Sequence, residues 1–273
     1  MVGDTQGQRV SFPAAWRDHR DRPVDRPELP GPQMPSFYTP IGTFQGATYE
    51  RNAFAQHTDH EVTWLWDALQ LAPGLTLVDL GCGTGRHARS FASLGVDVTA
   101  IDVSEALIAA GKQHPDAAEV TFHVGDAATM LHDKIQPASL DRAVSLHQGA
   151  LGISPAHDDA LLAGVARVLK PGGMFAANFF HALFAARHLV DGDAYDVING
   201  VHHQHADVRG PDSTRHTFDL WTTAYTVRDA VNELLRHGFT VTDVRGVEPG
   251  AFAKRETFTV GLDDPEFMVI ARR

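Results

Sequence analysis

The sequence predicts an α/β protein built on a doubly wound, mostly parallel β-sheet. Strand-like and helix-like segments alternate from residue 75 to residue 180, and a glycine-rich turn follows the first strand-like segment. Alternation at this spacing is typical of parallel strands joined by right-handed helical crossovers. The 273 residues fit one elaborated domain or a domain with an extension.

Short apolar runs mark the expected strands, at residues 75–81, 96–104, 120–127, 140–150, 174–180, 215–225, 239–247 and 265–273. Apolar residues at helical spacing mark the expected helices, at residues 58–71, 86–95, 104–113, 154–170 and 226–238. Pro171 and Gly172 are expected to end the fourth helix. The expected N-caps are Ser104, Ser154 and, with the capping-box partners Glu61 and Asp229, Thr58 and Thr226.

Two regions depart from this alternation. Residues 1–40 mix Arg, Asp and Pro with almost no apolar periodicity, which predicts an extended or disordered arm. Residues 41–273 form the expected domain. Within it, residues 181–225 are rich in histidine and turn residues, and we expect them to form an inserted cap over the site.

Composition limits the partners. The net charge of −11 disfavours a nucleic-acid partner, which needs Lys and Arg patches, and favours small molecules. The longest apolar runs are far below the ~20 residues that cross a bilayer, so no membrane partner is expected. Cys82 is the only cysteine, which excludes an intrachain disulfide, and no secretory signal is evident. A cytoplasmic location is therefore expected; nothing in the sequence sets the oligomeric state.

The glycine-rich turn suggests a nucleotide-like cofactor at the carboxyl end of the first strand. Gly81, Gly83 and Gly85 are spaced G-x-G-x-G, and Asp79 precedes them. The dinucleotide fingerprint requires glycine where this chain has Arg86. An NAD-dependent oxidoreductase is therefore disfavoured.

The segment "VDLGCGTG" resembles the first motif of class I S-adenosylmethionine-dependent methyltransferases. Asp102 ends the second strand and Asp126 the third, as in that family, and "ARVLKPGGMFAANFF" is similar to its helix, turn and fifth strand. The resemblance covers roughly residues 49–273. It implies the seven-stranded, Rossmann-like methyltransferase fold.

The resemblance also implies S-adenosylmethionine as the cofactor. Asp79 would help to hold its ammonium group, Asp102 would bind both ribose hydroxyls, and Asp126 would accept from the adenine amine. The other implied cofactor contacts are Tyr49, Gly81, Cys82, Gly83, Gly85, Val103 and Leu146 around the rings and backbone, and the N–H of Ala127.

The implied reaction is metal-independent, in-line transfer of a methyl group to a small-molecule acceptor. His147, after the fourth strand, is either a general base or a residue that packs against adenine or binds backbone. His181 is a second candidate base. A non-catalytic, adenosylmethionine-binding protein remains an alternative.

Three further residues are expected to contact the acceptor: Gln148, Trp221 and Tyr225. Aromatic side chains in the cap region suit a flat or cationic acceptor. The run "VHHQH", with His202, His203 and His205, is interpreted as an irregular surface or cap segment, and no metal site is expected there.

Overall fold

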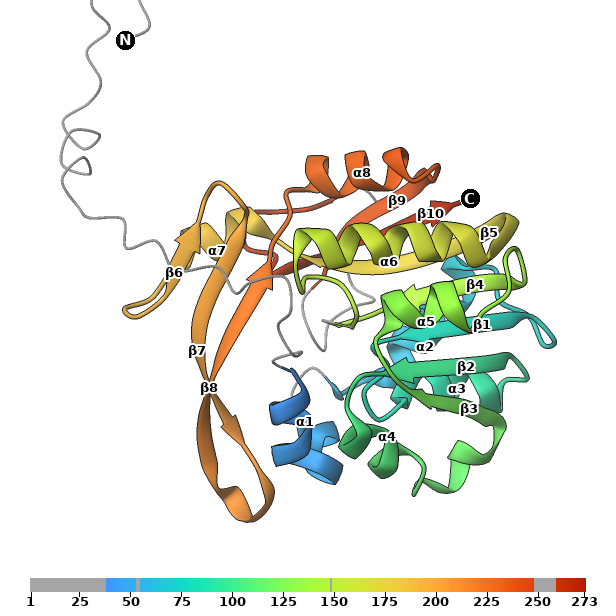
Figure 1. The fold of residues 1–273 in the computed structure, drawn as a ribbon, viewed down its shortest axis with the longest axis horizontal. Coiled ribbons are helices and arrows are strands. Elements are labelled where there is room, and N and C mark those ends of the chain that lie inside the picture. Colours follow the sequence, from blue (N-terminus) through green and yellow to red (C-terminus); the bar gives the residue numbers. More distant parts are fainter. Residues whose placement is uncertain (1–37, 53–54, 148, 248–258) are drawn as a thin grey trace, which may run out of the picture.

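A seven-stranded sheet forms the centre of the protein (Figure 1). The structure is a computed structural model that describes residues 38–52, 55–147, 149–247 and 259–273. The strand order is β3-β2-β1-β4-β5-β10-β9, and only β10 runs antiparallel to its neighbours. The predicted doubly wound, mostly parallel, seven-stranded sheet is confirmed. Its strands are β1 (Thr76–Leu80), β2 (Asp97–Asp102), β3 (Val120–Val124), β4 (Leu140–Ser145), β5 (Leu169–Phe180), β9 (Thr240–Val247) and β10 (Glu266–Arg272).

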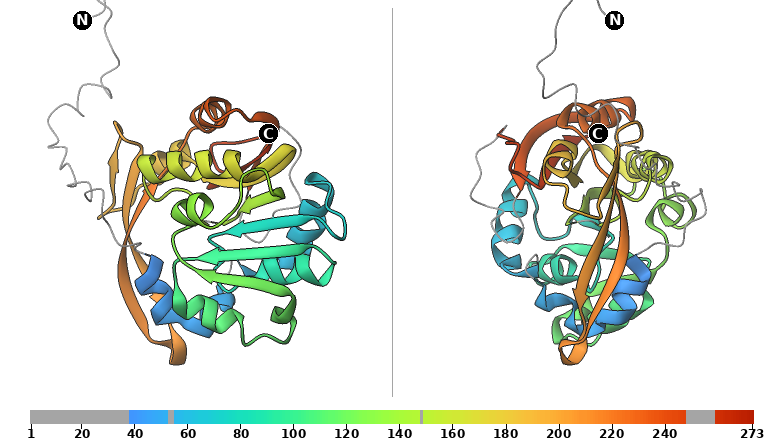
Figure 2. Two further views of the ribbon diagram at one scale, coloured as in Figure 1. Left: turned by 45° about the vertical axis from the view of Figure 1, so that its right-hand side comes forward. Right: turned by 90° about the vertical axis from the view of Figure 1, so that its left-hand side faces the viewer.

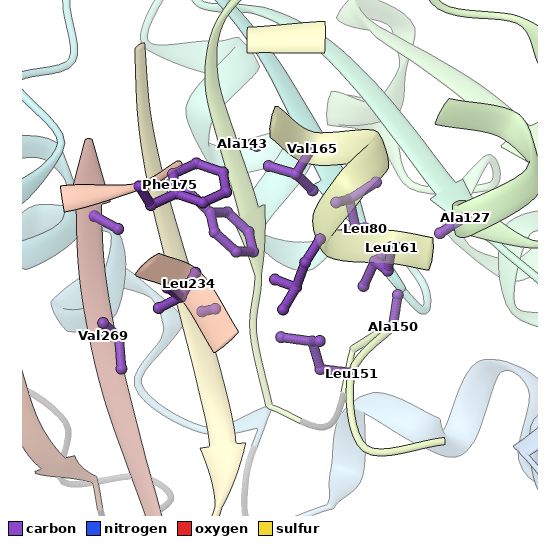
Figure 3. Packing of buried hydrophobic residues seen from close by; sticks show 14 of the residues in the cluster. Leu80, Ala127, Ala143, Ala150, Leu151, Leu161, Val165, Phe175, Leu234 and Val269 are labelled. Atoms are coloured by element: carbon purple, nitrogen blue, oxygen red, sulfur yellow. The ribbon is translucent and has the colours of Figure 1, made fainter. Parts of the chain in front are cut away.

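Helices cover both faces of this sheet. One face packs against α5 (Ala127–Asp133), α6 (Pro155–Val168) and α8 (Val227–Arg236) in a continuous apolar core. In Figure 3, Leu161, Val165 and Leu234 from these helices meet strand residues such as Phe175 and Val269. The opposite face packs against α2 (Thr58–Ala68) and α3 (Arg86–Ser93). Burial on both faces explains why the strands read as continuous apolar runs.

The remaining helices are short. They are α1 (Tyr38–Gln45), α4 (Glu105–Gly111), α7 (Ala182–Arg187) and the 3-10 segments Gly46–Arg51, Pro115–Glu119 and Pro211–Ser213. The sequence did not predict α1, α5 or α7. The expected arm, residues 1–40, falls outside the described residues up to position 37, and α1 begins at Tyr38.

The N-cap predictions had mixed outcomes. The Oγ atoms of Ser104, Ser154 and Thr226 each accept an N–H from the first turn of their helices, as predicted. The prediction for Thr58 was wrong: α2 is preceded by His57 with φ of 65° and has no side-chain cap. The Glu61 side chain is turned into the protein instead, toward Arg86. A buried cation outweighed the local capping bond.

The predicted end of the fourth helix was also wrong. Helix α6 ends at Val168, and residues 169–173 are already part of β5, which runs through Pro171 and Gly172. The pairing of β4 with β5 shifts register between Leu140 and Arg142, which accommodates the irregular start of β5.

A second, three-stranded antiparallel sheet forms the cap. It consists of β6 (Ala194–Asp196), β7 (Val201–Arg209) and β8 (Arg215–Thr223). The long β7–β8 hairpin crosses the carboxyl edge of the main sheet beside α1 (Figures 1 and 2). Gln45 donates to the carbonyl oxygen of Arg209 at 2.9 Å, and the rings of Phe44 and Phe218 lie 5.7 Å apart. The cap predicted at residues 181–225 therefore contacts α1, the helix that begins the described part of the chain.

The histidine-rich run was wrongly interpreted as irregular. His203 and His205 lie on β7 and share one face of it. Asp219 pairs with His205 in register, and its Oδ1 lies 2.9 Å from His203 Nε2 and 3.0 Å from His205 Nδ1. Carboxylate–imidazole contacts join the two strands of this hairpin, and the sequence pattern alone did not predict them.

The turn after β1 is tightly packed against the loop after β4. At Gly81 φ is 71°, and a Cβ atom would lie 2.2 Å from the carbonyl carbon of Gly149. Both the backbone conformation and the space therefore require glycine at this position.

We expect Gly81→Ala to lower the free energy of unfolding by about 2–4 kcal/mol, the sum of left-handed strain and overpacking. Gly172→Ala is the matched control, because φ there is 80° but a Cβ atom would meet nothing within 4 Å. That variant should lose only about 1–2 kcal/mol from strain. Urea denaturation measures the free energy of unfolding of both variants, provided that their m-values are equal. Equal losses in the two variants would show that the close approach to Gly149 does not contribute to the destabilisation.

Candidate active site

A cavity opens at the carboxyl edge of the main sheet. It contains about 620 Å³ of empty space, including space open to solvent, which is within the usual size of a small-molecule site. We call it the first cavity; its lining residues are Tyr38, Ile41, Tyr49, Gly81, Ile101, Asp102, Val103, Leu107, Gly125, Asp126, Ala127, Gly149, Ala150, Ile153 and His157. Six predicted cofactor contacts are among them: Tyr49, Gly81, Asp102, Val103, Asp126 and Ala127.

Asp102 fixes the geometry of the glycine-rich turn. Its Oδ2 accepts the N–H of Gly83 at 2.7 Å, and its Oδ1 accepts the N–H of Ser104 at 2.8 Å. Burial raises the pKa of Asp102, although these two backbone bonds lower it. The Tyr49 ring lies against Gly83, where a Cβ atom would come within 3.2 Å of the ring. The Asp102 carboxylate thus holds the turn in place and also lines the first cavity.

Asp79 is a buried carboxylate at the end of β1. It is 2% exposed, and its Oδ2 has no hydrogen-bond partner among the described residues. Burial is the main reason that the pKa of Asp79 rises to about 7; the charge of Asp102 raises it further and that of Arg86 lowers it. A buried oxygen of this kind requires a donor or a cation from outside the described chain.

Asp126 begins α5 and is held by a residue that the sequence did not indicate. Its Oδ1 accepts the N–H of Thr129 at 2.8 Å, and its Oδ2 lies 2.8 Å from His157 Nε2. Burial alone would lower the pKa of His157, but Asp126 and Asp158 outweigh it and raise it to about 9. His157 is therefore an imidazolium at neutral pH. The sequence offered one indication that His157 belongs to the site: it lies in the first turn of α6, the helix that follows β4.

His147 does not line the first cavity. Its Nε2 lies 2.9 Å from Glu61 Oε1, and its ring stacks on that of His87, with centroids 5.7 Å apart. Glu61 is 1% exposed, and its Oε2 lies 2.7 Å from both Arg86 Nη1 and His87 Nε2. Burial raises the pKa of Glu61, but the contacts with His147 and His87 outweigh it and hold it well below the ordinary value. The base role of His147 stays a prediction.

Three other predicted contacts, Leu146, Gly85 and Cys82, are not among the residues that line the first cavity. Leu146 is 5% exposed and belongs to the core beneath α2 and α3. Gly85 forms the N-cap of α3. Burial raises the pKa of the Cys82 thiol well above its ordinary value, so this thiol is not a nucleophile at neutral pH.

The residues predicted to contact the acceptor are not brought together. Trp221 stacks on His203, with ring centroids 3.9 Å apart. It is three residues from Phe218, so it lies on the opposite face of β8 from the one that meets α1. Tyr225 donates to Asp158 Oδ2 at 2.7 Å. Gln148 lies outside the described residues.

His181 lies in a separate cavity beneath the cap, which is described below. It is 3% exposed, and its Nδ1 lies 3.0 Å from the carbonyl oxygen of Asp264. It is not among the residues that line the first cavity, and its role as a base stays a prediction.

None of the described helices is long and apolar enough to cross a membrane.

Comparisons with known proteins agree with this geometry. Residues 77–173, from β1 to the start of β5, match a family model described as a methyltransferase domain. The demethylmenaquinone methyltransferase of Beutenbergia cavernae is 39% identical over 115 residues, which cover 42% of this chain and 44% of that protein. The chain spans about half the length of this relative, and it spans about half the length of two further curated relatives as well.

A longer match covers most of the chain at lower identity. The ubiquinone biosynthesis O-methyltransferase of Nitrobacter winogradskyi is 27% identical over 212 residues, which cover 75% of this chain and 71% of that protein. Among solved structures, the CcbJ methyltransferase from Streptomyces caelestis has a TM-score of 0.65 at 17% identity, covering 84% of this chain and 96% of that one. Residues 77–173 are therefore similar to a methyltransferase domain, the chain shares the fold of a solved methyltransferase, and the motifs at Asp79, Asp102 and Asp126 agree with this similarity.

Proposed function

We propose that this chain transfers the methyl group of S-adenosylmethionine to a small-molecule acceptor, with the cofactor bound in the first cavity. The observation that carries the proposal is the buried Asp79 Oδ2, which has no partner in the described chain and lies beside the glycine-rich turn. A cofactor ammonium group would supply the missing cation and donors.

The residues of the first cavity fit the rest of such a cofactor. Asp102 uses two of about four lone-pair sites on backbone N–H groups, which leaves acceptor capacity for two hydroxyls. Apolar side chains for an adenine ring come from Ile41, Val103, Leu107 and Ile153. The pair of Asp126 with His157 fixes polar groups at the same end of the cavity.

The cofactor supplies an activated methyl carbon on a sulfonium. The acceptor atom forms its bond to that carbon as the carbon–sulfur bond breaks, and the electron pair stays on sulfur. The chain's part is to align the two partners and exclude water, and alignment alone can supply ~7–11 kcal/mol of the barrier. A proton on the acceptor must leave to a base or to water. The contact between α1 and the β7–β8 hairpin supports a covered, small-molecule pocket.

The proposal is tested by calorimetry and by transfer of labelled methyl groups. We expect adenosylhomocysteine to bind at micromolar strength and NAD not to bind, because Arg86 replaces the last fingerprint glycine. Incubation with methyl-labelled cofactor and a metabolite extract should yield a labelled small molecule. Binding without any labelled product would favour the non-catalytic alternative, and binding of NAD alone would reverse the choice of cofactor.

Asp102→Asn should weaken adenosylhomocysteine binding by about 10- to 100-fold, because hydrogen bonds to a charged group are worth about 1.5–3 kcal/mol. The matched control is Asp97→Asn, at the other, exposed end of the same strand. Calorimetry on both variants, with thermal unfolding to verify the fold, gives the comparison. Equal affinities would place the ribose elsewhere.

The pKa of about 7 for Asp79 predicts a pH dependence of binding. An ammonium group favours the ionised carboxylate, so below pH 7 each binding event must release the proton of Asp79. Affinity for adenosylhomocysteine should therefore be level above pH 7 and fall as pH drops from 7 to 5.5, by at most about tenfold per unit. Asp79→Asn should remove this slope and bind weakly throughout. A slope that persists in the variant would assign it to another group.

A further inference from the structure

A second cavity lies between the cap, the carboxyl end of β5 and the amino end of β10. It contains about 880 Å³ of empty space, including space open to solvent. Its polar walls include Glu266 from β10, His181 after β5, and Thr222 and His202 from the cap; Phe180 and Phe184 supply aromatic surface. The proposed binding of the cofactor in the first cavity leaves this second cavity without an assigned ligand.

Glu266 is a buried acid at this cavity without a cation. It is 4% exposed, and among the described residues it forms no ion pair. Its Oε2 accepts from Asn178 Nδ2 at 2.8 Å, while the buried Oδ1 of Asn178 has no hydrogen-bond partner in the described part of the chain. Burial raises the pKa of Glu266, although His147 and Asn178 lower it. The unpartnered Oδ1 of Asn178 requires a donor, and a buried carboxylate such as Glu266 is stabilised by positive charge.

His181 adds a second acceptor. Its Nδ1 lies 3.0 Å from the carbonyl oxygen of Asp264, which can only accept, so Nδ1 carries the proton. In the neutral ring, Nε2 is then left with a lone pair. The only other acid in the lining, Asp193, already lies 3.1 Å from His202 Nε2. Among the described lining residues there is no lysine or arginine, so the cavity attracts cations.

The second cavity lies at the same edge of the main sheet as the first. Tyr38 lines the first cavity, and burial, followed by the charges of Tyr49 and Glu266, raises the pKa of its hydroxyl. Glu266 also pairs with Phe180 at the carboxyl end of β5, the edge at which β1 and β4 present the glycine-rich turn and its neighbours. A molecule in the second cavity would therefore lie at the same edge of the sheet as a cofactor in the first.

We infer that the acceptor is a small-molecule amine, whose nitrogen is bound by Glu266 and His181 in the second cavity. This inference rests on the function proposed above and specifies its substrate class. An ammonium group would satisfy Glu266 and the free acceptors, and Phe180 and Phe184 suit a cation or its apolar substituent. An alcohol would leave the buried carboxylate without compensating charge.

The chemistry of transfer follows from this placement. An amine that arrives as its ammonium gives one proton to Glu266 or to His181 Nε2, which frees the nitrogen lone pair. That pair forms the bond to the methyl carbon as the carbon–sulfur bond breaks with its electrons on sulfur. The products are the methylated ammonium and a neutral thioether, so charge and atoms balance.

The test compares amines with matched alcohols in the presence of saturating adenosylhomocysteine. The probes are phenethylamine against 2-phenylethanol and cyclohexylamine against cyclohexanol, measured by calorimetry. We expect at least one amine to bind tenfold or more tightly than its alcohol. With labelled adenosylmethionine, the same amine should yield its N-methyl product.

Glu266→Gln should remove this preference and weaken amine binding at least tenfold, while adenosylhomocysteine binds within twofold of the parent protein, which verifies the fold. Asp219→Asn, on the outward face of the cap hairpin, is the control and should keep the preference. Equal affinity for both members of each pair, no binding of either amine, or a preference that survives Glu266→Gln would overturn the inference. Failure of the parent protein to bind adenosylhomocysteine would instead overturn the proposed function.

Discussion

The carboxylate of Asp102 is the contact on which the site depends. It accepts the N–H of Gly83 from the turn after β1 and the N–H of Ser104 at the start of α4, so one side chain joins two neighbouring strand ends. Gly81 presses the same turn against the loop that follows β4. Three adjacent strands of the sheet are thereby fixed at their carboxyl ends. The first cavity has its shape because these backbone segments cannot move apart independently.

The buried carboxylates at this edge divide into two classes. Glu61 is compensated by Arg86 and two histidines, and Asp158 accepts from the N–H of Gly152 and the hydroxyl of Tyr225. Asp79 and Glu266 have no cation of their own among the described residues. Since an uncompensated buried charge is costly, the carboxylates of the first class are matched within the chain, and we propose that those of the second receive positive charge from ligands. Glu266 lines the second cavity, and Asp79 lies beside the glycine-rich turn, whose Gly81 lines the first.

The cap covers part of this edge. The alternation of side chains along β8 directs Phe218 toward α1 and Trp221 away from it, onto His203. The cap therefore contributes His202 and Thr222 to the second cavity rather than the tryptophan that composition alone favoured. A shift of one residue in the register of this hairpin would exchange these two faces.

Local pattern determined the sheet, most helix starts and the glycine-rich turn. These features arise from neighbours in the chain: apolar runs mark β1 to β5, and Ser104, Ser154 and Thr226 cap the helices they begin. Tertiary structure decided which charges meet. Glu61 binds Arg86, 25 residues away in the chain, instead of forming the expected capping box. The pairing of β10 with β5 places Glu266 at the second cavity. Interactions between distant segments leave no periodic signal, because their energy depends on burial and separation in space.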